Sequence, residues 1–207
     1  MKVGKKYLPF WIIGIVLLLD QAFKIWIKLH LQLGEEIYVF DWFRIHFLEN
    51  EGMAFGFSFG GDWGKLALSI MRIMVVILVI WYIAKLIKQN ENTWQIVSWS
   101  LIVAGALGNI LDSAFYGLMF SESYYEVAQI FPAGGGYAPF LHGKVVDMLY
   151  FPLIEGHFPQ WLPIWGGEYF LFFQPVFNLA DSAISIGVII FLIAQKNVIF
   201  SNKKPLA

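Results

Sequence analysis

Four long runs of apolar residues follow one another along the chain, and polar segments of unequal length separate them. Each run is close to the roughly 20 residues that an α-helix needs to cross a bilayer. The pattern therefore predicts four transmembrane helices, two long connecting segments (28–65 and 117–175) and one short turn (88–93). The four runs extend over about residues 8–27, 66–87, 94–116 and 176–194.

The long connecting segments carry patterns of their own. Residues 35–47 partly alternate polar with apolar side chains and are rich in aromatic and β-branched residues, which is typical of a strand or hairpin lying on the membrane. Residues 157–175 are dense in Trp, Tyr and Phe, which is typical of an interfacial belt or of a simple lipid anchor. Residues 120–143 contain three consecutive glycines and little periodicity, so we expect a flexible loop.

The composition agrees with a membrane protein. Hydrophobic residues make up 58% of the chain and charged residues 14%, against about 45–50% and 25% in soluble domains. These values exclude a soluble globule and a disordered chain. The absence of cysteine excludes a thiol nucleophile and a disulfide framework. With a net charge of −1, the chain has no polycationic character for binding nucleic acid.

Basic residues gather at one end of the four predicted helices. Three segments that flank the helices hold eight of the 14 Lys and Arg residues and a single acid, Glu91. Because basic residues favour the cytoplasmic side, we expect both termini in the cytoplasm and the long segments outside the plasma (inner) membrane of a bacterium. The eight residues are Lys2, Lys5, Lys6, Lys85, Lys88, Lys196, Lys203 and Lys204.

The first apolar run is interpreted as an uncleaved anchor, because it is long, carries Asp20 and has no small-x-small cleavage site after it. The predicted fold class is thus an all-α polytopic membrane protein. It has four transmembrane helices, a small β-sheet at the outer face and an extracytoplasmic helix or loop. A single domain covers residues 1–207.

Polar residues lie at a similar depth in all four predicted helices, in the outer third of each. Ionisable groups are costly inside a bilayer and face a protein interior or a wet cavity. We therefore expect one hydrated pocket that opens outward and has walls from all four helices. The residues are Asp20 in the first helix, Arg72 in the second, Asn109 and Asp112 in the third and Asp181 in the fourth.

Each of these groups also has a purely structural interpretation. Asp20 and Lys24 are four residues apart and can form an ion pair on one helix face. Asn109 and Asp112 can form hydrogen bonds between closely packed helices. Arg72 can extend its side chain to the outer interface. Small residues that permit close helix approach lie just before Asn109: Ala104, Gly105, Ala106 and Gly108.

Asp147 lies outside the predicted helices, in an apolar segment that we expect to be loop-like (144–151, KVVDMLYF). Two neighbouring carboxylates share a proton, because both cannot ionise cheaply. The ionised member can then activate water, and the protonated member can polarise a carbonyl group. Such a pair would hydrolyse a peptide bond without cysteine or metal. Serine catalysis is the alternative, but no motif pairs a serine with any of the four histidines (His30, His46, His142 and His157).

Five short blocks, in order along the chain, resemble the motifs of the lipoprotein signal peptidase (signal peptidase II) family. Single blocks are short, but five in the right order on four predicted helices are specific. Asp20–Lys24 resembles DQxxK, Asn50–Gly56 resembles NxGxAFS with Gly in place of Ser, Gly105–Asp112 resembles GxxGNxxDR, Val145–Met148 resembles VVDF, and Phe177–Ser182 resembles FNxADS.

The resemblance implies an aspartic endopeptidase of the plasma membrane that cuts prolipoproteins just before a cysteine carrying diacylglycerol. It implies Asp147 and Asp181 as the catalytic pair. We expect no metal or cofactor, because the sequence shows no cluster of metal ligands. It also implies an outer β-cradle, a mobile periplasmic helix, contact with membrane lipids, and inhibition by globomycin. The positions that it implies as supporting or substrate-binding are Asn50, Gly52, Asn109, Asp112 and Asn178, with Asp20 and Lys24 in a supporting role.

The chain departs from the family pattern in two places. Ser113 stands where the family has Arg, and we hypothesise that Arg72 supplies the missing positive charge. The segment between Asp112 and Asp147 is long for the family, and it is either a lid or a passive insertion. Two other functions are weighed: a small transporter, although the inner halves of the helices carry no polar relay, and a non-catalytic lipoprotein-binding protein.

Overall fold

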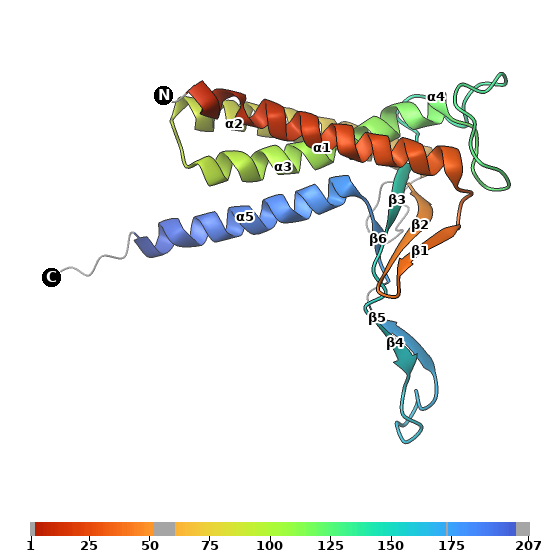
Figure 1. Ribbon diagram of the computed structural model, residues 1–207. Helices are drawn as coiled ribbons and strands as arrows, with labels where there is room; N and C mark the ends of the chain where they lie inside the picture. Colours follow the sequence, from red (N-terminus) through yellow and green to blue (C-terminus); the bar gives the residue numbers. More distant parts are fainter. Residues whose placement is uncertain (1–2, 52–60, 173, 202–207) are drawn as a thin grey trace.

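The computed structural model describes residues 3–51, 61–172 and 174–201. Four long helices have roughly aligned axes, and a β-sheet lies at one end of them (Figure 1). The start of the first helix and the end of the last helix lie at the other end (Figure 1). The four helices are α1 (Val3–His30), α2 (Gly61–Lys88), α3 (Thr93–Leu111) and α5 (Leu179–Ser201).

Three of the four predicted transmembrane helices are confirmed as helices long and apolar enough to cross a membrane: Gly4–His30, Trp63–Lys88 and Thr93–Met119. In the fourth, the apolar part is the shorter stretch Leu179–Gln195, so its crossing stays a prediction. The fourth helix also begins later than expected, because residues 176 and 177 form strand β6 (Val176–Phe177).

The end of the bundle away from the sheet collects basic residues. Lys85 and Lys88 lie in the last turn of α2. The Lys5 ammonium donates to the Glu91 carbonyl oxygen at 3.0 Å, which joins the start of α1 to the α2–α3 turn. The predicted orientation, in which this end faces the cytoplasm, stays a prediction.

Glycines permit close packing between α3 and its neighbours. A Cβ atom on Gly105 would lie 2.1 Å from the Ala180 carbonyl oxygen, and one on Gly108 would lie 2.7 Å from Asp20 Oδ2. Further along, a Cβ atom on Gly187 of α5 would lie 2.7 Å from the Ser98 carbonyl oxygen. The predicted role of small residues in helix approach is confirmed at positions 105 and 108.

A four-stranded antiparallel sheet lies at one end of the helices, in the order β1-β2-β3-β6. It consists of β1 (Glu36–Phe40), β2 (Phe43–Asn50), β3 (Val145–Tyr150) and β6. The hairpin expected within 35–47 is confirmed. The expectation of a loop-like segment around Asp147 is wrong, because β3 is a central strand between β2 and β6. Its mostly apolar run is typical of a strand covered on both faces.

The segment 120–143 has no named strand, in agreement with the predicted loop, but its backbone is bonded to the bundle. The Ala138 amide donates to the Gly117 carbonyl at 2.9 Å, and the Gly143 amide donates to the Ser113 carbonyl at 2.8 Å. The helix before it continues from α3 through a π-helical turn, η2 (Asp112–Tyr116), and ends with α4 (Gly117–Met119). The contacts favour a packed insertion over a free lid.

A buried ion pair holds this insertion to the rest of the molecule. The ammonium of Lys28, which is fully buried, lies 2.6 Å from Glu49 Oε1 and donates to the Ser123 hydroxyl at 2.8 Å. Lys144 lies 3.3 Å from Glu49 and 3.1 Å from Glu122. Burial lowers the pKa of Lys144, but the carboxylates of Glu49 and Glu122 have the larger combined effect and raise this pKa above its ordinary value. The cluster connects α1, β2 and the start of β3.

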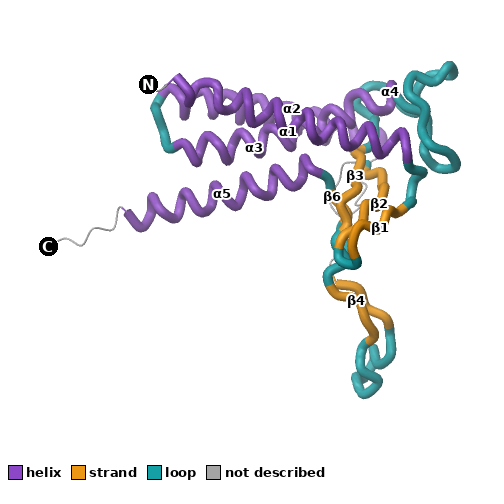
Figure 2. Tube along the Cα trace, in the orientation of Figure 1, coloured by secondary structure: helices purple, strands orange, loops and turns teal. Residues whose placement is uncertain are grey.

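A second sheet contains only two strands, β4 (Ile154–His157) and β5 (Tyr169–Phe172), which pair antiparallel. They form a hairpin that projects sideways from the sheet end of the bundle, across the direction of the helices (Figures 1 and 2). The hairpin lies between β3 and β6 in the sequence. It therefore joins the strand that carries Asp147 to the helix that carries Asp181.

Candidate active site

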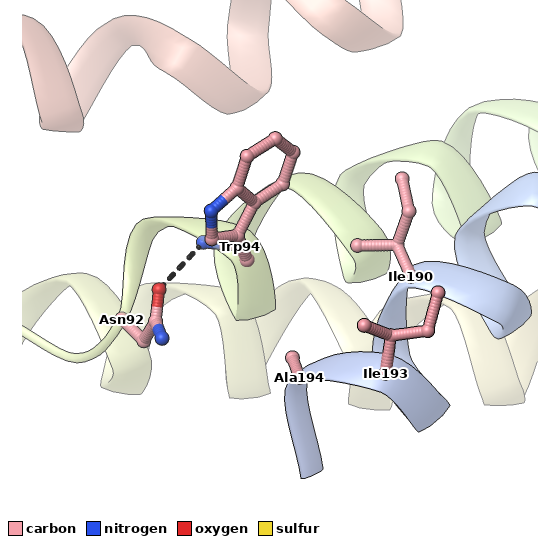
Figure 3. A pocket seen from close by; sticks show the side chains of 5 residues that line it. All are labelled: Asn92, Trp94, Ile190, Ile193 and Ala194. Atoms are coloured by element: carbon pink, nitrogen blue, oxygen red, sulfur yellow. Dashed lines mark hydrogen bonds between the residues drawn. The ribbon is translucent and has the colours of Figure 1, made fainter. Parts of the chain in front are cut away.

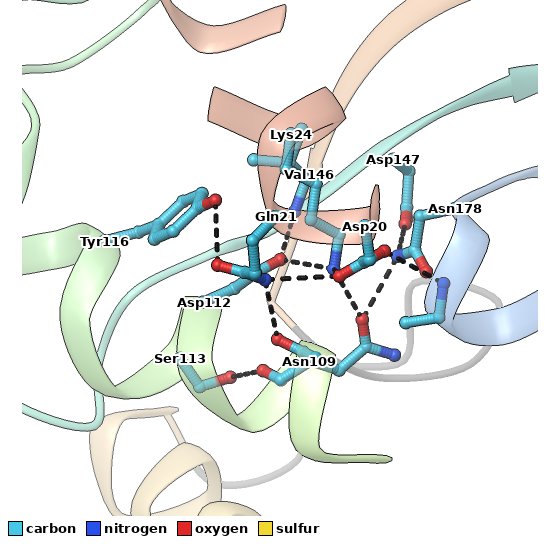
Figure 4. A network of polar contacts seen from close by, with 12 residues as sticks. Asp20, Gln21, Lys24, Asn109, Asp112, Ser113, Tyr116, Val146, Asp147 and Asn178 are labelled. Carbon is cyan, nitrogen blue, oxygen red and sulfur yellow. Dashed lines mark hydrogen bonds and ion pairs between the residues drawn. The ribbon is translucent and has the colours of Figure 1, made fainter. Parts of the chain in front are cut away.

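Asp147 and Asp181, the catalytic candidates, are connected by two asparagine side chains. Asp147 lies in the middle of β3 and is 4% exposed, whereas Asp181 lies in the first turn of α5 and is half-buried. The Asn178 amide donates to Asp147 Oδ1 at 2.7 Å, and the Asn109 amide donates to Asp181 Oδ1 at 2.7 Å. The Asn178 amide also donates to Asn109 Oδ1 at 3.2 Å, so the chain of hydrogen bonds is continuous. Figure 4 shows its part from Asp147 through Asn178 to Asn109.

Asn178 also fixes the start of α5. Its side-chain oxygen accepts from the Asp181 amide at 2.8 Å, which is the bond expected of a helix N-cap. The predicted fourth helix, over about residues 176–194, includes Asn178. In the structure it lies one residue before the helix, and a single side chain thereby contacts both catalytic candidates.

Asp147 accepts a second hydrogen bond, from the Asn50 amide to Oδ2 at 3.2 Å. Burial raises the pKa of Asp147 to about 7, and the negative charge of Asp181 contributes, while the Asn50 and Asn178 bonds act in the opposite direction. A carboxyl group with this pKa retains its proton for much of the time at neutral pH. One of the two acids can therefore serve as a proton donor.

Lys24 lies behind the asparagines and is fully buried. Its ammonium is 3.1 Å from Asp20 and 2.8 Å from Asp112, and it donates to Asn109 Oδ1 at 3.0 Å (Figure 4). The predicted pairing of Asp20 with Lys24 is confirmed, and Asp112 joins it. The ion cluster positions the Asn109 amide that contacts Asp181.

The two acids of this cluster also hold the backbone beside the catalytic candidates. Asp112 Oδ2 accepts from the Val146 amide at 3.2 Å. Asp20 Oδ1 accepts from the Ala180 amide at 2.9 Å. Each of these amides belongs to the residue directly before a catalytic candidate. Helix α1 and the residue that caps the end of α3 thus determine where β3 and α5 present their carboxylates.

Two further residues of the network were not predicted as site residues. The Gln21 amide donates to Asp112 Oδ1 at 2.8 Å, and the Tyr116 hydroxyl donates to Gln21 Oε1 at 3.2 Å (Figure 4). The position of Gln21 in the DQAFK block was a signal that could have identified it. The position of Tyr116 depends on the π-helical turn η2, which no sequence pattern indicated.

The structure brings together eight of the nine predicted site residues, and the ninth, Gly52, lies outside the described residues. Ser113, at the position of the family Arg, donates its hydroxyl to the Asn109 carbonyl at 3.0 Å within its own helix. Arg72 of α2 interacts electrostatically with Asp181. The hypothesis that Arg72 supplies the missing positive charge stays a prediction.

Two surface hollows lie away from this network. One, of about 270 Å³, is lined by Asn92, Trp94, Ile190, Ile193 and Ala194 at the bundle end far from the sheet (Figure 3). The other, of about 350 Å³, lies in the insertion beside Tyr124 and Tyr125. Neither contains a predicted site residue, and the expected hydrated pocket stays a prediction. Within residues 3–51, 61–172 and 174–201, no group of three or more His, Asp or Glu side chains could hold a metal ion.

The chain is similar to known membrane peptidases in sequence and fold. Residues 12–196 match the family described as signal peptidase (SPase) II. A lipoprotein signal peptidase of Porphyromonas gingivalis is 52% identical over 189 residues, covering 91% of this chain and 82% of the relative. One of Amoebophilus asiaticus is 38% identical over 190 residues, covering 88% of this chain and 76% of the relative.

Solved structures show a similarity in fold as well. One bacterial membrane enzyme, 25% identical, superposes with a TM-score of 0.65 over 100% of this chain and 96% of its own. A second, 27% identical, superposes with a TM-score of 0.60 over 94% of each chain. The family match covers most of the chain, and it contains all five blocks on which the resemblance was based. The chain therefore belongs to the signal peptidase II family of membrane proteases.

Proposed function

We propose that the protein is an aspartic endopeptidase that removes signal peptides from diacylglyceryl-modified prolipoproteins. Cleavage falls just before the lipidated cysteine. The observation that carries the proposal is the hydrogen-bonded connection from Asp147 through Asn178 and Asn109 to Asp181. Relatives named lipoprotein signal peptidases support the substrate class. Membership in a protease family favours this function over a transporter.

The burial of the two acids suggests how they divide the chemistry. Asp181, which is half-buried and interacts electrostatically with Arg72, accepts a proton from water as the water oxygen attacks the scissile carbonyl carbon. Asp147, which is almost fully buried, gives its proton to the carbonyl oxygen. In the second half of the reaction Asp147 recovers that proton as the carbonyl reforms. Asp181 passes its proton to the leaving amide nitrogen as the C–N bond breaks.

The position of the site fits a lipid-anchored substrate. Asp181 lies in the first turn of α5, at the end of the bundle that carries the sheet. A substrate whose acyl chains remain in the outer leaflet presents its scissile bond near that level. We therefore assign the sheet end to the outer face of the bacterial plasma membrane. Membrane lipids surround the site, and globomycin is the expected inhibitor by family resemblance.

The direct test is cleavage of a purified prolipoprotein in detergent or lipid. One substrate carries diacylglycerol on its cysteine, and the matched control is the same protein without the lipid. We expect cleavage of the lipidated form only, at the bond before the cysteine, and inhibition by globomycin. Equal cleavage of both forms would refute the substrate class. A chain that binds the lipidated substrate but never cleaves it would support the binding-protein alternative.

The role of Arg72 has its own test. Arg72→Ala removes the positive charge near Asp181, and Arg72→Lys keeps it. We expect a lower cleavage rate for the alanine variant and partial rescue by lysine. Unchanged activity and stability of Arg72→Ala would remove this residue from the site.

A further inference from the structure

The β4–β5 hairpin and the residues that connect its strands (158–168) have no role in the proposed chemistry. The hairpin projects across the direction of the helices, at their sheet end (Figures 1 and 2). Because α1, α2 and α3 are long and apolar enough to cross a membrane, a projection in this direction runs along the membrane surface. It does not point away into water.

The hairpin exposes large apolar side chains. Soluble monomers rarely expose apolar patches of this extent, which mark membrane or protein contact sites. Ile164, at the tip, has a φ of 81°, a backbone conformation that β-branched residues rarely adopt. The exposed residues are Trp161 (78%), Ile164 (85%), Trp165 (53%), Tyr169 (57%) and Phe172 (59%).

Aromatic rings continue from the base of the hairpin to the main sheet. Phe151 packs against Phe43 at 4.9 Å and Phe177 at 5.7 Å between ring centroids. It also packs against Trp42 at 6.3 Å, and Trp42 is 55% exposed. This aromatic cluster lies where the chain leaves β3 for the hairpin, because Phe151 directly follows β3.

The charge of the hairpin restricts what it can bind. From Val145 to Gln195 the sequence contains no Lys or Arg, whereas Glu155 and Glu168 are acidic. The hairpin therefore has no Lys or Arg side chain that could attract anionic headgroups or an acidic protein. Trp, Tyr and Phe beside a membrane helix partition into the interface between lipid and water without such attraction.

We propose that the β4–β5 hairpin inserts its aromatic tip into the lipid–water interface at the sheet end of the bundle. The hairpin connects β3 to β6 and α5. An anchor at this place holds the two catalytic candidates at a fixed depth. The inference rests on the membrane helices and the hairpin, and it does not require the proposed cleavage reaction.

Single cysteines test the depth directly, because the natural chain has none. A nitroxide label on Ile164→Cys is compared with one on Gly134→Cys, whose position in the insertion has open space around it. Both full-length variants are reconstituted in phosphatidylcholine vesicles. Collision with oxygen, which concentrates in lipid, and with a water-soluble nickel chelate is then measured.

We expect the label at 164 to collide about fivefold less with nickel than the label at 134, and more with oxygen. Adding phosphatidylglycerol to the vesicles should not move the label at 164 deeper into the membrane. Equal access of nickel to both labels would overturn the proposal. Shielding of the 164 label from both reagents would overturn it too, because that result means a protein covers the tip.

A second variant links the depth to the aromatic residues. Replacing Trp161 and Trp165 by Ser in the labelled protein should restore nickel access at position 164 without changing the melting temperature. It should raise KM for the lipidated substrate in vesicles and leave KM in detergent unchanged. An unchanged depth would refute the role of the tryptophans. A catalytically inactive protein with the expected depth would refute the proposed function alone.

Discussion

At the scale of single residues, Asn178 is the side chain on which both catalytic candidates depend. Its amide donates to Asp147, and its carbonyl oxygen caps the helix that begins two residues before Asp181. An alanine at this position would leave an Asp147 oxygen and a helix amide without their bonds. Hydrogen bonds to charged groups contribute about 1.5–3 kcal/mol, so the effect should appear in catalysis as well as in stability.

Asn178→Ala should lower the cleavage rate by about 10–100-fold, because a loss of 1.4 kcal/mol corresponds to a factor of ten. It should also lower the free energy of unfolding by about 1 kcal/mol through the lost cap. The matched control is Asn92→Ala, which removes the cap of α3, where the Asn92 oxygen accepts from the Trp94 amide at 3.0 Å. The control should lose similar stability and keep full activity. Full activity in Asn178→Ala would contradict the assignment.

The protonation of Asp147 makes a prediction for pH. With a pKa of about 7, its donated proton is lost as the pH rises through that value. Cleavage by the wild type should therefore fall about tenfold per pH unit above about 8. The pH dependence of kcat, measured between pH 5 and 9, checks this. A rate that stays constant to pH 9 would refute Asp147 as the proton donor.

The stability of the protein should also depend on pH through the Asp147 carboxyl group. The folded carboxyl has a higher pKa than the ordinary value of 3.8, so the folded state binds more protons between the two values. The free energy of unfolding therefore decreases as the pH rises from about 4 to about 7. Asp147→Asn should lack this decrease. An identical pH dependence of stability in both proteins would contradict the raised pKa.

At the scale of elements, hydropathy and alternation predicted most of the helices and the β1–β2 hairpin, and they failed where an element depends on partners distant in sequence. β3 was expected to be loop-like, because a short apolar run does not reveal the strands that flank it. The late start of α5 follows from the pairing of β6 with β3 and from the Asn178 cap. The π-helical turn η2 leaves no periodic signal.

Helix packing at the site is tested with a glycine. Gly105→Ala places a Cβ atom 2.1 Å from the Ala180 carbonyl, so α3 and α5 must separate. Overpacking of this kind costs about 1–3 kcal/mol, and we expect a lower melting temperature and slower cleavage, because Asp181 moves with α5. Gly14→Ala in α1 meets nothing within 4 Å and is the control. A stable, fully active Gly105→Ala would show that the close contact is not required.

At the scale of the whole molecule, the site depends on the assembly of all the parts around it. Asp20 from α1 holds the start of α5, and Asp112 at the end of α3 holds β3. The resemblance to the family predicted these acids as supporting residues. Only the structure shows what they support, because the contacts join residues up to 160 positions apart in the chain.

The orientation of the molecule is tested by labelling from one side of the membrane. Asn90→Cys lies in the α2–α3 turn, at the bundle end where α1 starts and α5 ends. Gly134→Cys lies in the insertion, at the sheet end. In intact cells an impermeant maleimide should label position 134 directly and position 90 only after the membrane is opened. The opposite result would reverse the predicted topology and place the site in the cytoplasm.

The central claim is that Asp147 and Asp181 together perform the cleavage. The most direct measurement is the single-turnover rate of Asp147→Asn and Asp181→Asn on the lipidated substrate, with Asp41→Asn in the exposed β1–β2 turn as the matched control. Folding is checked by melting temperature and inhibitor binding. We expect both site variants to lose about 10³-fold or more in rate and the control to lose nothing. A folded site variant that keeps a rate close to that of the wild type would contradict the paired-acid mechanism.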